Sequence, residues 1–135
     1  MKSSLIALMT LAASTTLPLS SHACGVCIED KVAATYDYAV VTKAEAMHHL
    51  VVFCEIIGAV EMEPLTARIV ALAPRVRGID RGTLRTSASP AAISFALDPA
   101  VQAPASAVAD LQKQLRTQGV RLRVVRVFKG EANAR

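Results

Sequence analysis

LVVFCEII, at residues 50–57, is the stretch from which the fold can be worked out. It is short, rich in β-branched and aromatic side chains, and followed by Gly58, a pattern typical of a β-strand. Strand alternation puts Leu50, Val52, Cys54 and Ile56 on one face and Val51, Phe53, Glu55 and Ile57 on the other. The thiol of Cys54 is therefore expected to be buried and to pack as a small apolar side chain.

Five further elements are expected after this strand. They are a helix over 64–73, strands over 82–87 and 91–97, a helix over 105–118 and a strand over 120–128. Pro64 suits the first turn of a helix, and Gly119 is typical of the residue that ends one. Residues 91–97 and 120–128 alternate between two kinds of side chain, as half-buried strands do.

This order, βαββαβ, predicts an α+β fold of the ferredoxin-like kind over residues 49–129, with a four-stranded antiparallel sheet. Both helices are expected to cover one face of that sheet. The other face is expected to stay polar, since Arg85, Ser94, Arg121 and Arg123 fit there. Residues 130–135 are expected to be a disordered tail.

Residues 24–48 are expected to hold one extra element. The apolar positions of 28–47 recur every three to four residues without glycine or proline, which predicts one continuous helix. Glu29 and Asp30 lie in its first turn, where the helix dipole favours acidic side chains. This helix either covers part of the open sheet face or projects from the domain.

Residues 50–128 resemble a heavy-metal-associated domain, the small fold of copper chaperones and of copper-ATPase N-termini. The residues that carry the resemblance are the LVVFCEIIG strand at 50–58, Val76-Arg77-Gly78-Ile79, Asp98-Pro99 and LRTQGV at 115–120. The resemblance implies the ferredoxin-like fold and a link to copper. However, the family's Met-x-Cys-x-x-Cys loop is replaced by GAVEMEP at 58–64, so its metal site does not carry over.

Residues 1–23 have the pattern of a secretory signal peptide. Lys2 precedes an apolar run over 5–11, and Ser21-His22-Ala23 is a small-x-small cleavage site. Cleavage after Ala23 predicts a soluble periplasmic or secreted protein that begins at Cys24. Lipidation of Cys24 is the alternative, but Ser21 stands where a lipoprotein signal has an aliphatic residue.

Cys24-Gly25-Val26-Cys27 is the main candidate for chemistry. This spacing brings two sulfurs to one metal ion or into one small disulfide, and soft thiolates select Cu(I) and also suit Zn(II). A helix beginning after Cys27 would favour its thiolate. The interpretations left open are metal binding, thiol–disulfide exchange, and a structural or unused cysteine pair.

Three other residues are weaker candidate ligands, namely His48, His49 and Met62. A continuous helix of about twenty residues would place the histidines about 30 Å from the thiols, at about 1.5 Å per residue. They are therefore not expected to complete a Cys2His2 site within one chain. A single methionine such as Met62 is more often core or surface filler than a ligand.

Charge and composition narrow the function classes. The chain has a formal charge of +4, and its late basic residues are Arg116, Arg121, Arg123 and Arg126. With 4% aromatic residues and an export signal, a nucleic-acid partner is not expected. No motif supports hydrolase or transferase chemistry, so enzymatic activity is left undecided. The expected partners are a metal ion and another exported protein or a membrane transporter; a non-catalytic interaction domain is the third hypothesis.

Overall fold

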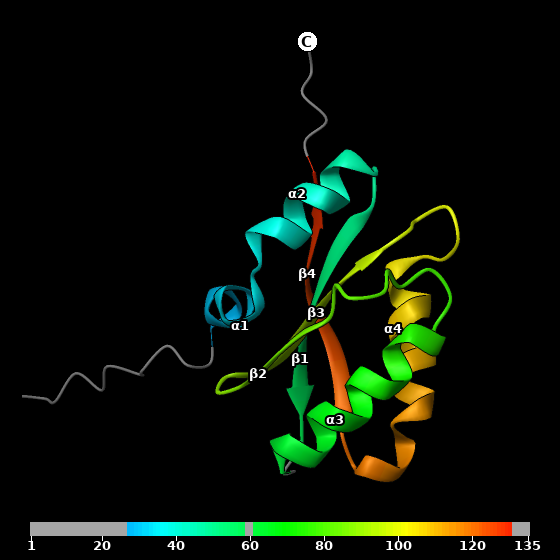
Figure 1. The fold of residues 1–135 in the computed structure, drawn as a ribbon. Coiled ribbons are helices and arrows are strands. Elements are labelled where there is room, and N and C mark those ends of the chain that lie inside the picture. Colours follow the sequence, from blue (N-terminus) through cyan, green and yellow to red (C-terminus); the bar gives the residue numbers. More distant parts are fainter. Residues whose placement is uncertain (1–26, 59–60, 131–135) are drawn as a thin grey trace, which may run out of the picture.

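The computed structural model describes residues 27–58 and 61–130 as a four-stranded antiparallel sheet with helices on both faces (Figure 1). The helices are α1 (Ile28–Thr35), α2 (Tyr38–Ala46), α3 (Met62–Leu72) and α4 (Pro104–Gln114), and the strands are β1 (Leu50–Ile57), β2 (Arg85–Ala88), β3 (Ala91–Leu97) and β4 (Arg121–Lys129). The strand order is β2-β3-β1-β4. The α+β, ferredoxin-like fold predicted from the sequence is confirmed, with the extra N-terminal segment as an addition to it.

The main core lies between the sheet and the pair α3 and α4. Val52, Cys54 and Ile56 of β1 point into it, and Phe95 of β3 is fully buried beside them. The alternation expected for 50–57 is therefore confirmed. Burial of these apolar side chains supplies the largest stabilising contribution of the domain.

The opposite sheet face is covered as well. Val40, Val41 and Ala44 of α2 pack on Val51, Phe53 and Ala96 in a second, smaller core. Ser94 lies on this face as expected, but the expectation of an open, polar face is wrong, because the face is covered and Ser94 is 1% exposed beneath α1. The N-terminal segment covers the face instead of projecting from it.

The prediction of one continuous helix over 28–47 is also wrong. The helix is interrupted at Tyr36 and Asp37, which have extended backbone conformations. The Asp37 carboxylate accepts hydrogen bonds from the backbone N–H groups of Ala39 and Val40, at 2.9 and 3.2 Å. Asp37 is thus the N-cap of a second helix, a role that aspartate favours.

The remaining element boundaries differ from the predictions by a few residues. The helix expected over 105–118 ends at Gln114 and continues as a short 3-10 turn, Arg116–Gln118. Gly119 follows it at φ 67°, the left-handed conformation that glycine adopts without strain. The strand expected over 82–87 begins only at Arg85. At Thr83 the side-chain hydroxyl, and not a backbone carbonyl, accepts the hydrogen bond from the N–H of Ala96, at 3.0 Å. The predicted tail lies outside the described residues except for Gly130.

Candidate functional site

Cys27 is the N-cap residue of α1. Its backbone is extended, with φ −70° and ψ 146°, and the residue is exposed. Cys24, the signal peptide and its cleavage site lie outside the described residues. The structure therefore places one of the two predicted thiols, and it places it where the helix dipole favours a thiolate.

Helix α1 is fastened to the sheet by a series of polar contacts. In chain order, Glu29 contacts Arg126 on β4, Lys31 contacts Glu55 on β1, Thr35 contacts Ser94 on β3, and Asp37 contacts Arg85 on β2. This is also the order of the strands across the sheet, so α1 crosses all four of them. Because the helix begins over β4, Cys27 lies at the β4 edge.

Glu55 is the centre of this attachment. The residue is 5% exposed, and its carboxylate pairs with both Lys31 of α1 and Arg123 of β4. Burial would by itself raise the pKa of Glu55, but the pairing of its carboxylate with Lys31 and Arg123 holds that pKa below its usual range. The carboxylate is thus kept charged against the sheet.

Two further ion pairs, one exposed and one partly buried, lie at the two ends of α1. Arg126 forms a two-pronged pair with Glu29, with one Nη1–Oε2 distance of 2.9 Å. The Arg85 Nε donates to Asp37 at 2.7 Å. Hydrogen bonds from these arginines lower the pKa values of both Glu29 and Asp37.

A β-bulge in β4 places both sheet arginines under α1. Arg123 is opposite Glu55 and Arg126 is opposite Phe53, so Val125 is an extra residue between them. In a regular strand, residues three apart point to opposite faces. The extra residue restores a common face, so that Arg126 reaches Glu29 of α1 while Arg123 pairs with Glu55 on the same side of the sheet.

The two histidines lie in the turn between α2 and β1, at the end of α2 that is farther from α1 along the chain. His49 Nδ1 is 2.6 Å from Asp80 Oδ2, and His49 Nε2 is 3.7 Å from Asp98 Oδ2. His48 is exposed at φ 59° and lines a small cavity of about 60 Å³ with His49 and Glu45. Because the helix is interrupted, the continuous helix of about 30 Å expected from the sequence is not present. The histidines still follow α2, in the turn before β1.

The remaining sulfur atoms lie in separate places. Met62 is the first residue of α3 and packs against the main core. Cys54 is fully buried, and burial raises the pKa of its thiol to about 12. The expectation that Cys54 packs as an apolar side chain is confirmed. Across residues 27–58 and 61–130, no three His, Cys, Asp or Glu side chains are grouped as a metal site.

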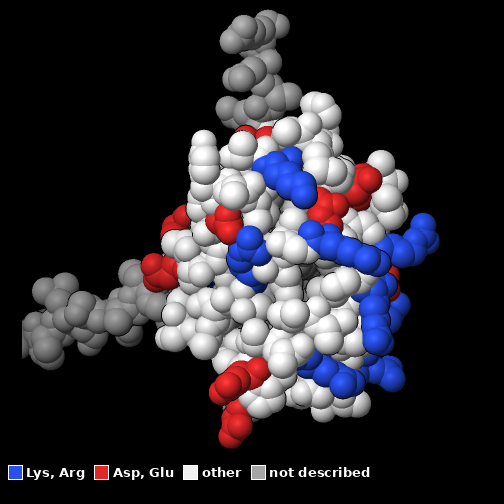
Figure 2. All heavy atoms as spheres, in the orientation of Figure 1, with Lys and Arg blue, Asp and Glu red and all other residues white. Residues whose placement is uncertain are grey.

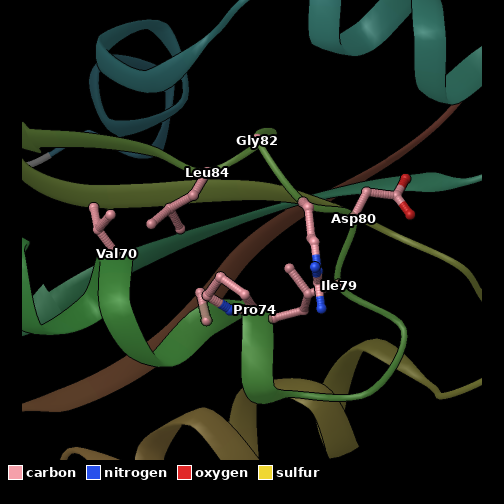
Figure 3. A pocket seen from close by; sticks show the side chains of 8 residues that line it. Val70, Pro74, Ile79, Asp80, Gly82 and Leu84 are labelled. Atoms are coloured by element: carbon pink, nitrogen blue, oxygen red, sulfur yellow. The ribbon is translucent and has the colours of Figure 1, made fainter.

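A cavity of about 170 Å³ opens on the α3 side of the sheet, on the face opposite α1 (Figure 3). Val70, Pro74, Ile79 and Leu84 surround it, and the Asp80 carboxylate points away from it. Its lining is mainly apolar and contains none of the predicted ligands. None of the helices in the described part of the chain is both long and apolar enough to span a membrane.

Sequence reasoning missed the residues that attach α1. One signal was available, because Asp37 preceding a helical run is a typical N-cap. Glu55 was a second signal, as the one charged residue of an otherwise apolar strand. Its partners could not be deduced, since Lys31 and Arg123 are far from it in the sequence.

The comparisons with protein-family models, with curated proteins and with solved structures found no match. The fold assignment accordingly rests on the strand order and pairing.

Proposed function

We propose that this chain is an exported protein that binds one soft metal ion, Cu(I) or Zn(II), through Cys24 and Cys27. The observation that carries the proposal is the position of Cys27, exposed at the start of a helix fastened to all four strands. A thiol in that position is presented on a fixed support. Thiolates are the ligands that Cu(I) and Zn(II) share.

The fold supports the same assignment. A heavy-metal-associated domain has this strand order, and we propose that the chain is a degenerate member of that family. In it, the metal ligands of the β1–α3 loop would be replaced by the Cys-x-x-Cys before α1. Of the original loop motif only Met62 remains, and its side chain is engaged with the core.

Thiol–disulfide exchange through the same pair is the second candidate. The N-cap position of Cys27 favours it, because the helix dipole stabilises the attacking thiolate. The acidic side chains of Glu29 and Asp30 in the first turn act against it, since negative charge disfavours a thiolate.

Metal titration of the exported, reduced protein tests the proposal. One Cu(I) or Zn(II) per chain or per dimer is expected, with affinity falling at lower pH because the thiols must lose their protons. The Cys24→Ser/Cys27→Ser variant should lose binding, whereas the Cys54→Ala control and a His48→Ala/His49→Ala variant should keep it. Full affinity in the double serine variant contradicts metal binding at this pair.

The redox candidate predicts a different result. A Cys24→Ser or Cys27→Ser variant would then trap a mixed disulfide with a partner protein, and the pair would have a measurable reduction potential. Intact mass of the exported protein checks the processing step, because cleavage after Ala23 without acylation is expected.

A further inference from the structure

The outer edge of β4 is divided into two halves. Among the described strands, β4 has β1 as its one neighbour. The first half of its free edge is blocked by the side chain of Gln112, which donates to the Val120 carbonyl at 2.7 Å and accepts the Leu122 N–H at 2.5 Å. One side-chain amide thus makes both hydrogen bonds that an added strand would make there.

The second half, residues 124–129, is open. The hydrogen bond from the Leu122 N–H to Gln112 shows that the backbone groups of Leu122 point away from β1. Because this direction alternates along a strand, the backbone groups of Val124 also point away from β1. The bulge at Val125 shifts the pattern, so Val127 is outward-facing after it. In the described part of the chain no hydrogen bond is seen at these outward groups, and the residues Val127 and Phe128 are 40% and 36% exposed.

The charge of β4 indicates which kind of segment can bind at its free edge. β4 reads RLRVVRVFK and contains basic but no acidic residues. Arg123 and Arg126 are paired with Glu55 and Glu29, whereas Arg121 and Lys129 make no ion pair within the described residues. A second copy added through the same strand would bring two basic strands together, which like-charge repulsion disfavours.

We propose that residues 124–129 of β4 accept an extended acidic segment of a partner protein as an additional strand. Backbone hydrogen bonds supply the pairing, as in other strand additions, and the acidic side chains of the segment meet Lys129. Gln112 limits the addition to the half of the edge that lies away from α4.

The docked segment lies beside the thiol site. The pair between Glu29 and Arg126 holds the start of α1 over β4, so Cys27 is at the same edge as the open half. A partner strand at residues 124–129 therefore brings its own protein next to Cys27. The use of this contact for metal or disulfide exchange rests on the proposed function, whereas the docking itself does not.

A capped peptide of alternating glutamate and valine, acetyl-(Glu-Val)4-amide, is the probe. Amide chemical shifts of the metal-free, full exported chain should change at residues 124–129 on titration, and binding should weaken as salt is added. The matched lysine–valine peptide should bind at least about ten-fold more weakly. A nitroxide on one of the two peptide ends should broaden the amides of residues 27–30.

Two variants of one residue separate strand addition from charge attraction. Val127→Pro removes an outward N–H and leaves the β1 pairing intact, so binding should fall at least about ten-fold. Val127→Thr keeps the N–H and should bind within about two-fold of the original chain. Lys129→Glu, which leaves the backbone unchanged, should weaken the glutamate peptide and strengthen the lysine peptide.

Several outcomes overturn the proposal. Lysine and arginine side chains gather on the side of the molecule where α4 lies (Figure 2). If the peptide changes amide chemical shifts on that side and not on β4, it binds by nonspecific charge attraction. Unchanged binding by Val127→Pro excludes strand addition. Concentration-dependent shifts of β4 without peptide mean that a second copy occupies the edge.

The same titration on the Cys24→Ser/Cys27→Ser variant keeps the two proposals apart. Docking needs neither thiol, so this variant should bind the peptide as the original chain does. If it does and the original chain binds no metal, the proposed function fails and the docking surface stands. If the original chain binds metal and does not bind the peptide, the docking surface fails and the proposed function stands.

Discussion

The two faces of the sheet are covered in different ways. Against α3 and α4 the sheet buries a continuous apolar core that includes Phe95 and Ile69. Against α1 and α2 it buries a smaller cluster around Phe53, and α1 itself is held by ion pairs and one buried hydrogen bond. The first cover, like the contact of α2, depends on area removed from water, whereas the attachment of α1 depends mainly on charge. Changes in pH and substitutions of single charged residues should therefore loosen α1, the helix that follows Cys27, more readily than α3 or α4.

A pair of phenylalanine substitutions gives the largest expected effect and tests this difference directly. Phe95→Ala should lower the free energy of unfolding by about 3–5 kcal/mol, because the main core cannot close around the cavity. Phe53→Ala should cost less, about 2–3 kcal/mol, since α2 can settle into the space. Urea unfolding at neutral pH measures both. Equal losses would mean that the N-terminal helices are as rigidly packed as α3 and α4.

Glu55→Gln should have the next largest effect. It removes the charge that Lys31 and Arg123 share and leaves Lys31 nearly buried with a neutral partner, a loss of about 1–3 kcal/mol. Amide hydrogen exchange should become faster in α1 than in α3. Glu45→Gln, which removes the same charge from the exposed side of α2, is the control and should change neither quantity.

The contrast between the faces also explains what the sequence could predict. The pattern of 50–57 determined which side chains of β1 enter the main core, because apolar burial follows a period of two. The attachment of α1 was not predictable, since Glu29 and Arg126 are brought together by the whole sheet and by a bulge at Val125. The break at Asp37 was missed because the apolar period continues across it. Of the candidate ligands, Cys27 was placed where the pattern indicated, and Cys24 stays a prediction.

Acid should release α1 before it opens the main core. The pKa values of Glu29, Asp37 and Glu55 are all lowered in the folded chain. A lowered pKa contributes stability that is fully present above the ordinary carboxylate range, about 4, and is lost as pH falls through the folded value. Exchange protection of α1 amides, corrected for the intrinsic rate, should therefore fall below about pH 4 while that of α3 persists. Loss of both together would contradict the separation.

Ser94→Ala should give the smallest effect and the most specific test of how α1 is attached. The Ser94 hydroxyl is buried and donates to the Thr35 carbonyl at 2.8 Å, so its loss should cost about 1 kcal/mol. Ser87→Ala on β2 is the control and should stay within about 0.5 kcal/mol of the original. If α1 is bound as one unit, Glu55→Gln already loosens it, and Ser94→Ala should then cost less in that background than alone. Strict additivity of the two losses would show instead that each contact holds its own part of α1, and that Cys27 is not released by weakening the centre of the helix.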